Sequence, residues 1–159
     1  MHRARSRRRV HFERGFTLIE LLIVVTIIGI IAALAFPNLR NALDRAKQKA
    51  TMQNMKAIGN ALEMYSADHN TYPRSLSNAD SSALAGLLSP IYMRTVPPGD
   101  GWNNAWHLDT NATGSEYTIT SYGRDGAPGN ITGGQTNDVN CDIVYTNSAF
   151  YQWPGGAQQ

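Results

Sequence analysis

The chain has 159 residues, enough for one domain, and a formal net charge of +2. Residues 1–15 contain six arginines and one glutamate, whereas the remaining residues contain eight basic and eleven acidic side chains. The basic character therefore belongs to the first fifteen residues, which argues against a specific nucleic-acid-binding protein. A single cysteine, Cys141, excludes an intrachain disulfide, and the four scattered histidines lack zinc-site spacing.

Residues 16–36 are apolar apart from Thr17, Glu20 and Thr26. As a helix they would span roughly 31 Å, about the thickness of the hydrocarbon core of a bilayer. They are apolar on every side, which suits lipid or a packed interior. The arginines just before them predict a cytoplasmic N-terminus and an outward-facing C-terminal part.

Helical periodicity continues beyond this segment, through residues 37–68. Pro37 removes one helical hydrogen bond, so we expect a kink there. Apolar residues then recur at steps of three and four, while charged residues occupy the other faces. The sequence therefore predicts one helix from residue 16 to about residue 68, whose second half has an apolar stripe that must be covered. The stripe consists of Leu39, Ala42, Leu43, Ala46, Ala50, Met55, Ile58, Ala61, Leu62 and Tyr65.

Residues 69–159 can supply that cover as a globular head. We expect a short helix at 81–88, and the aromatic and β-branched residues predict strands at 106–108, 116–122 and 143–146. A glycine-rich loop follows at 123–134. The predicted fold is α+β: a long N-terminal helix with a small antiparallel sheet packed on its second half. The aromatic residues near the C-terminus fit a strand and core better than a contact surface; they are Tyr145, Phe150, Tyr151 and Trp153.

Two features of the apolar segment call for a reason. Glu20 places a carboxylate in hydrocarbon, at a cost of about 2.5–3.5 kcal/mol on insertion scales. One interpretation is a charge at the membrane edge that snorkels or is protonated. The other starts from residues 15–20, Gly-Phe-Thr-Leu-Ile-Glu, directly after the basic leader.

These six residues resemble the prepilin signature of type IV pilins and type II secretion pseudopilins. The resemblance implies that a prepilin peptidase cleaves between Gly15 and Phe16 and methylates the new N-terminus of Phe16. It also implies that Glu20 pairs with the α-amino group of Phe16 in a neighbouring subunit of a homopolymeric filament. A cytoplasmic assembly ATPase, an inner-membrane assembly platform and minor pilins or pseudopilins are the further partners that the family implies.

A secretory signal peptide is the alternative route of processing. The small residues of Ala33-Leu34-Ala35 allow cleavage before Phe36, and Ser6-Arg7-Arg8 is similar to part of a twin-arginine leader. The length of the apolar run, the presence of Glu20 and the continuing amphipathic helix argue against this route.

Four later segments resemble the major pseudopilin of type II secretion systems. Residues 70–73 and 96–106 are similar to its Tyr-Pro and Asp-Pro-Trp-Gly-Asn-Pro-Tyr segments, although the second match is loose. Residues 121–126 resemble its Ser-Leu-Gly-Ala-Asp-Gly segment, and residues 140–143 resemble Asp-Ala-Asp-Ile.

In that family the last loop binds calcium, which implies a calcium-type loop at residues 121–143. Calcium takes six to eight oxygen ligands, and a glycine-rich loop lets carbonyl groups turn inward beside carboxylates. The ligands carried over from the family are the side chains of Asp125, Asn140 and Asp142 and the carbonyl of Tyr122. Asn140 replaces an aspartate, and Asp138 is a possible substitute. Ordinary turn-forming residues in a loop without metal are the alternative.

The sequence lacks a phosphate-binding glycine motif, a nucleophile elbow and a paired-carboxylate cleft, so we expect no enzyme. The predicted function is a filament subunit, a major pseudopilin for protein secretion. It would be anchored in the inner membrane before assembly and lie in a periplasmic or cell-surface filament afterwards. Two alternatives stay open: a type IV pilus subunit for adhesion, twitching motility or DNA uptake, and a non-polymerising bitopic membrane protein with a ligand-binding head.

Overall fold

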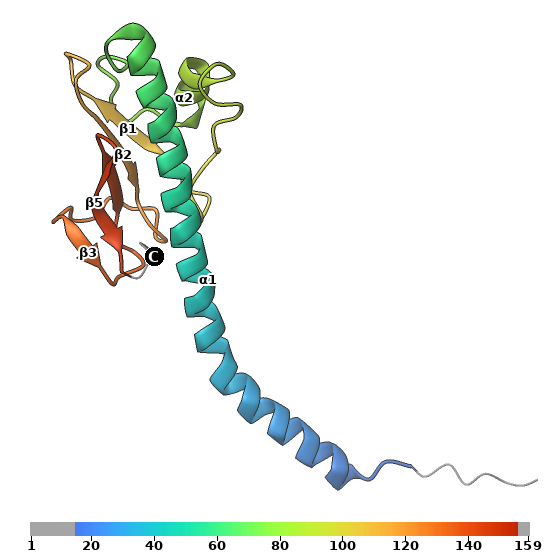
Figure 1. Cartoon of the computed structure of the whole chain (residues 1–159). Helices are drawn as coiled ribbons and strands as arrows, with labels where there is room; N and C mark the ends of the chain where they lie inside the picture. The colour runs from blue at the N-terminus through green and yellow to red at the C-terminus, as the bar shows by residue number, and fades with distance from the viewer. Residues whose placement is uncertain (1–14, 156–159) are drawn as a thin grey trace, which may run out of the picture. The chain divides into compact units, whose positions relative to one another are not determined.

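The computed structural model describes residues 15–155, which form two compact units divided between Leu39 and Arg40. Helix α1 (Leu18–His69) belongs to both units, and Figure 1 shows it as one continuous helix. The predicted helix of residues 16 to about 68 is therefore confirmed to within two residues. The helix also continues through Pro37, although proline cannot donate to the carbonyl four residues earlier. Of the predicted leader, residues 1–15, only Gly15 lies within the described residues.

The first unit consists of the beginning of α1. From residue 15 to residue 39 every residue except Ala32 is exposed, including the large apolar side chains. Their helical state needs no tertiary contact here because the segment is long and its backbone groups bond to each other. Such a surface requires lipid or other protein to cover it.

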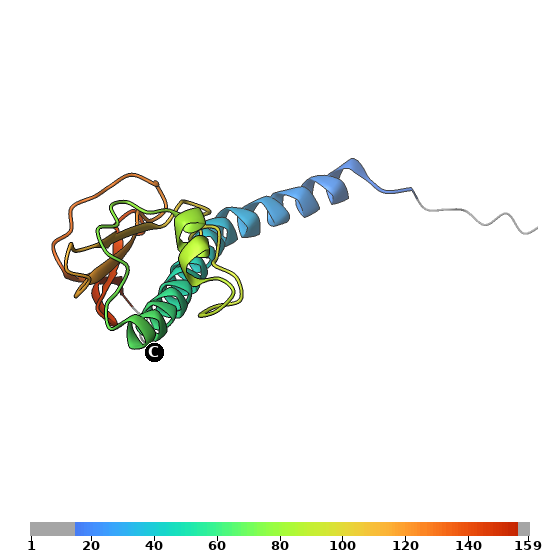
Figure 2. The same ribbon diagram turned by 90° about the horizontal axis from the view of Figure 1, so that it is seen from above.

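The second unit contains the rest of α1, helix α2 (Ser81–Leu88) and a five-stranded sheet. The strands are β1 (His107–Thr110), β2 (Tyr117–Ser121), β3 (Gly134–Thr136), β4 (Ile143–Thr146) and β5 (Ala149–Pro154). Their order is β1-β2-β4-β5-β3. Figure 1 and Figure 2 show α2 and the sheet beside the second half of α1, as the sequence predicted. The predicted apolar stripe is buried only from Met55 onward. Its first five members are exposed, and Asp44, Gln48 and Thr51 are buried in that stretch instead; the exposed members are Leu39, Ala42, Leu43, Ala46 and Ala50.

The sheet is mixed, whereas the sequence predicted an antiparallel sheet. Strands β1, β2, β4 and β5 pair antiparallel, but β3 pairs parallel with β5. Strand β3 has only three residues and begins at Gly134. The sequence predicted a loop at Gly134, because these residues lack the apolar alternation that marks a strand. The aromatic C-terminal segment forms β5, which confirms the strand prediction, although Tyr151 is half exposed.

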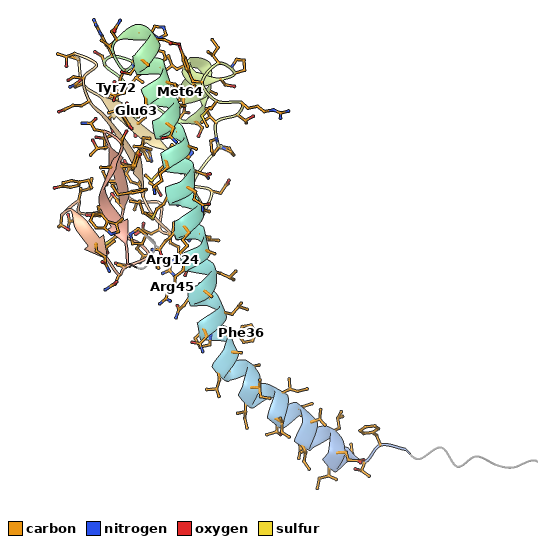
Figure 3. The ribbon with its side chains drawn as sticks, viewed as in Figure 1. Phe36, Arg45, Glu63, Met64, Tyr72 and Arg124 are labelled. Carbon is orange, nitrogen blue, oxygen red and sulfur yellow. The ribbon has the colours of Figure 1, made fainter. Side chains whose placement is uncertain are left out.

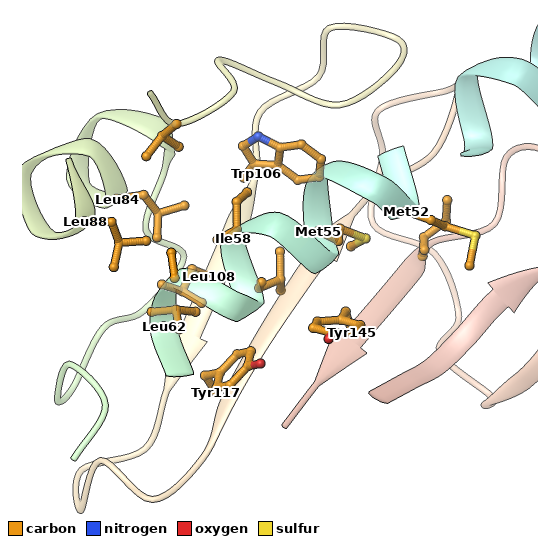
Figure 4. Close-up of a cluster of buried hydrophobic side chains, with 14 residues drawn as sticks. Met52, Met55, Ile58, Leu62, Leu84, Leu88, Trp106, Leu108, Tyr117 and Tyr145 are labelled. Atoms are coloured by element: carbon orange, nitrogen blue, oxygen red, sulfur yellow. The ribbon is translucent and has the colours of Figure 1, made fainter. Parts of the chain in front are cut away.

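The core lies between α1, α2 and the sheet (Figure 4). Its largest fully buried side chains come from all three parts: Met55, Ile58, Leu62, Leu84, Leu88, Trp106, Leu108, Tyr117, Ile119 and Ile143. At Gly59, α1 approaches the sheet so closely that a Cβ atom would lie 2.5 Å from Cε1 of Tyr145. Helix α1 then ends at His69, where Asn70 takes a positive φ of 58° typical of a helix C-terminus.

Candidate functional site

The predicted processing site lies in an exposed segment just before α1. Gly15 and Phe16 are not helical, and Phe16 keeps 83% of its surface exposed. No heavy atom beyond the adjacent residues lies within 4 Å of where a Cβ of Gly15 would be. The peptide bond between these two residues is therefore accessible in the part of the chain that the structure describes.

Thr17 and Glu20 form a reciprocal cap at the start of α1. The Glu20 carboxylate accepts a hydrogen bond from the Thr17 backbone N–H at 3.0 Å and one from its hydroxyl at 2.8 Å. The Glu20 N–H in turn donates to Thr17 Oγ1 at 3.2 Å. This capping box satisfies backbone donors that the first helical turn would leave unpaired. Glu20 therefore has a structural partner in its own chain.

The sequence analysis missed this cap, although its signal was present. The spacing Thr-x-x-Glu before an apolar run is the sequence signature of a capping box. The same two residues belong to the processing motif, so one hexapeptide contains both signals.

The apolar part of α1 has the length and composition of a membrane-crossing helix. Glu20 is its only charged residue between Leu18 and Phe36. Thr26, the next polar residue, bonds through its hydroxyl to the Leu22 carbonyl at 2.7 Å, so it presents no free donor. The segment is thus suited either to lipid or to packing against other apolar helices.

The second predicted site, the loop of residues 121–143, contains one buried carboxylate. Asp142 keeps 1% of its surface exposed, and the Gly129 N–H donates to both of its oxygens at 3.2 and 3.1 Å. Burial raises the pKa of Asp142, and the charge of Asp125 raises it further, while the Gly129 N–H and His107 oppose these effects. The structure therefore brings Asp125 and Asp142 close enough for their charges to interact.

Asn140 and Asp138 are engaged elsewhere. Arg124 Nε donates to Asn140 Oδ1 at 3.1 Å, and its Nη1 forms an ion pair with Asp44 Oδ2 on α1 at 3.2 Å. Asp138 accepts the Asn140 N–H at 2.9 Å. The predicted ligand Asn140 is thus bonded to Arg124. Sequence analysis did not predict this arrangement, because Asp44, which holds Arg124, is 80 residues away from it in the sequence.

The beginning of the loop is fixed by a buried aspartate, Asp100. It accepts the Ser121 hydroxyl at 2.6 Å and the backbone N–H groups of Trp102 and Asn104 at 2.9 and 2.8 Å. The Asn104 amide donates to the Gly123 carbonyl at 2.7 Å. The ring of Tyr122, whose carbonyl was a predicted ligand, stacks on His107 with centroids 3.9 Å apart.

These residues fit a calcium ion in part. Among residues 15–155, no group of three or more His, Cys, Asp or Glu side chains is arranged for a metal. Two carboxylates, Asp125 and Asp142, share one region, and the remaining ligands of an oxygen-rich site would be carbonyl groups and water. The donor set is therefore hard and oxygen-based, which suits calcium better than zinc.

Comparison with known proteins identifies relatives along most of the chain. The family model described as type II secretion system (T2SS), protein G matches residues 38–142, and the prokaryotic N-terminal methylation motif matches residues 11–36. No solved structure matches the chain significantly.

Several curated relatives carry the name type II secretion system core protein G. The protein from Escherichia coli (strain K12) is 33% identical over 125 residues, which cover 74% of this chain and 86% of that protein. The protein from Pseudomonas aeruginosa is 32% identical over 135 residues, 80% of this chain and 92% of the relative. The protein from Vibrio cholerae is 28% identical over 133 residues, 77% and 88% of the two chains.

Proposed function

Because this chain belongs to the type II secretion system protein G family, the family of the major pseudopilins, we propose that it is the repeating subunit of a homopolymeric secretion filament. The family consists of structural filament subunits, so the chain is not an enzyme. The match over residues 38–142 favours this function over a type IV pilus subunit or a non-polymerising membrane protein. The observation that carries the filament is the exposed apolar half of α1, which needs partners to cover it.

We propose that the chain is processed before it assembles. A prepilin peptidase would cleave between Gly15 and Phe16 and methylate Phe16. The exposed, non-helical backbone at this bond supports the proposal, as does the methylation motif matched at residues 11–36. Cleavage would remove the basic leader and place a new amino group one residue before the Thr17–Glu20 cap.

Before assembly, the apolar half of α1 would anchor the subunit in the inner membrane with its N-terminus in the cytoplasm. An assembly platform and minor pseudopilins would then incorporate it into a periplasmic filament. Within the filament, Glu20 would pair with the amino group of Phe16 in a neighbouring copy. A pair of opposite charges removes the cost of an isolated carboxylate between apolar helices.

Two variants of Glu20 separate its pairing role from its capping role. Glu20→Gln keeps an oxygen that can accept the Thr17 N–H but carries no charge to form an ion pair with an ammonium group, whereas Glu20→Ala loses both the acceptor and the charge. We expect both variants to enter the membrane and neither to form filaments, as measured by electron microscopy and sedimentation of sheared filaments. Filaments of normal length from Glu20→Gln would refute charge pairing.

Mass spectrometry of the mature chain tests the processing step. A first peptide that begins at methylated Phe16 is the expected result. A first peptide that begins at Phe36 would identify a secretory signal peptide and remove the filament anchor.

We propose further that the loop of residues 121–143 binds calcium through Asp125 and Asp142, with the Tyr122 carbonyl as an additional ligand. The burial of Asp142 supports this, because a buried carboxylate with a second acid beside it is stabilised by a cation. Calcium would supply that positive charge and hold the two ends of the loop together. We do not include Asn140 in the proposed ligand set, because its Oδ1 accepts a hydrogen bond from Arg124.

Thermal unfolding of the full chain in detergent, with calcium or with a chelator, tests this site. A ligand that binds only the folded state raises the melting temperature. We expect calcium to stabilise the wild-type chain and the Asp138→Asn variant but not Asp142→Asn. Equal melting temperatures of the wild-type chain under both conditions would refute the site.

A further inference from the structure

A polar cavity of about 310 Å³ lies between α1 and the ends of β3 and β5. The side chains of Asn41, Arg45 and Gln48 on α1 line one side. The other side is lined by Thr136, Asn137, Val139, Pro154 and Gly155. The cavity shares no residue with the Thr17–Glu20 cap or with the pair Asp125 and Asp142.

Gln48 marks this cavity as a site rather than a surface depression. It keeps only 6% of its surface exposed, yet no hydrogen bond to its side chain occurs among residues 15–155. No fully enclosed polar side-chain atom in the described chain lacks a partner, so the Gln48 amide must open into the cavity, where water rather than any of residues 15–155 satisfies it. A guest that offers oxygen acceptors can replace that water.

The charge of the cavity indicates an anionic guest. Arg45 contributes a guanidinium, and it forms no ion pair within residues 15–155, since neighbouring Asp44 pairs with Arg124. The amides of Asn41 and Gln48 lie on the same helix beside this cation. A guanidinium beside amide donors is the set that recognises a carboxylate.

The opposite end of the second unit offers exposed carboxylates. Arg45 and the end of α1 at His69 are 24 residues apart, roughly 36 Å along the helix. Beyond that end, the Tyr72 N–H donates to the Gly114 carbonyl, which places the turn between β1 and β2 there. Figure 3 shows the same polarity, with Arg45 and Arg124 beside one stretch of α1 and Glu63 and Tyr72 beside another.

One acid at that end is available for an intermolecular contact. Exposed Asp68, Asp80 and Asp109 each accept a hydrogen bond within the chain. The side chain of Glu116, in the β1–β2 turn, forms none among the described residues, nor does it form an ion pair with nearby Arg74. No side chain can bridge the distance from Glu116 to Arg45 within one copy.

We propose that the cavity at Arg45 and Gln48 receives the Glu116 carboxylate of a second copy. This inference rests on the proposed filament function and names one of its contacts. The two patches differ and lie at opposite ends of the unit, so the contact is heterologous. A heterologous contact repeats without closing and generates an open filament. Arg40 and Lys47, each adjacent in sequence to a residue that lines the cavity, add a positive field that attracts the acidic end of the next copy.

Charge exchange tests the contact. We expect Arg45→Glu and Glu116→Arg each to lower filament yield about tenfold or more, because each leaves like charges facing each other. The combined variant Arg45→Glu with Glu116→Arg should recover filaments. Lys49→Glu, on the same helix but outside the cavity lining, is the matched control and should assemble nearly as the wild type does. Failure of the combined variant to recover would overturn the assignment of Glu116.

Gln48→Leu gives a second test whose two readouts move in opposite directions. Leucine has similar size and no amide that needs a partner, so the unfolding midpoint of the free chain should stay constant or rise. Filament yield should fall nonetheless. A fall in both would mean that Gln48 acts only in folding, and the site would be refuted.

Further outcomes distinguish this contact from the filament function and from lipid binding. If the wild-type chain forms filaments and Arg45→Glu forms them equally well, this contact fails while the filament function stands. If the wild-type chain forms none, the filament function itself fails. If Arg45→Glu loses binding to anionic lipid vesicles but still forms filaments, the cavity is assigned to a lipid phosphate and the proposal is overturned.

Discussion

The two halves of α1 differ in what stabilises them. In the first unit nearly every residue of the helix is exposed, and its side-chain hydrogen bonds are those of the Thr17–Glu20 cap and the one from the Thr26 hydroxyl to the Leu22 carbonyl. In the second unit the same helix buries Met55, Ile58 and Leu62 against α2 and the sheet. The half in the second unit is therefore stabilised by packing within a single chain, whereas the apolar surface of the half in the first unit is covered only by lipid or by further copies.

A matched pair of leucine variants gives the largest expected contrast. Leu62→Ala removes a fully buried side chain and should lower the free energy of unfolding of the second unit by about 2–5 kcal/mol. Leu34→Ala removes a side chain that is 71% exposed and should leave that value unchanged. Urea denaturation in detergent, followed by tyrosine and tryptophan fluorescence, measures both. A large loss of stability from Leu34→Ala would show that the second unit depends on the first.

A matched pair of glycine variants sharpens the comparison. Alanine normally favours a helix over glycine by about 1 kcal/mol. Gly59→Ala should nevertheless destabilise the chain by about 1–3 kcal/mol, because the new Cβ would lie 2.5 Å from the buried ring of Tyr145. Gly29→Ala meets no atom within 4 Å and should be neutral or stabilising before assembly. Loss of filaments from Gly29→Ala alone would locate a close helix–helix contact of the assembled state.

The response to alkaline pH should come from the second unit alone, since all seven tyrosines follow residue 40. The pKa of Tyr72 and that of Tyr117 are each raised from 10.0 to about 12, mainly by burial and in part by the nearby charge of Glu63. Tyr72 and Tyr117 each donate a hydroxyl to Glu63, at 2.9 and 3.3 Å. The folded chain thus keeps protons that the unfolded chain has lost.

The sign of the pH effect follows from this difference. The contribution of these two tyrosines to stability should be constant below about pH 10 and should fall between pH 10 and about pH 12, where the unfolded state binds fewer protons than the folded state. Denaturation midpoints across this range measure the slope. Tyr72→Phe should reduce the slope, and an unchanged slope in that variant would assign the alkaline response to other groups.

Much of the fold was predictable because its periodicity is local. The run of apolar residues followed by a stripe at steps of three and four defined α1, and Ser81–Leu88 was predicted at the bounds that the structure gives. Strand β3 was missed because Gly-Gln-Thr has no strand pattern of its own and is fixed by pairing with β5. Parallel pairing is a property of the whole sheet, which no short segment specifies.

The sites were predictable only to the extent that their residues are neighbours in sequence. Gly15, Phe16 and Glu20 follow from one hexapeptide, and the loop at 121–143 follows from two short segments. The partners of that loop come from elsewhere: Asp44 and Asp100 hold Arg124 and Ser121 across 80 and 21 residues. The cavity at Arg45 joins α1 to the last strand, so sequence spacing gave no sign of it.

The smallest effect that we predict concerns the link between the loop and α1. Arg124 is partly exposed and bonds to both Asp44 and Asn140, so Arg124→Gln should cost only about 0.5–1 kcal/mol of unfolding free energy. Its local effect should be larger, because Asn140 would lose the bond that ties it to the helix. Hydrogen exchange of amides in residues 138–142 should therefore accelerate in Arg124→Gln but not in Arg40→Gln, whose side chain forms no ion pair among the described residues. Exchange that stays as slow as in the wild type would mean that the Asp100 turn alone holds the loop, and that the ion pair between the loop and α1 contributes nothing to its order.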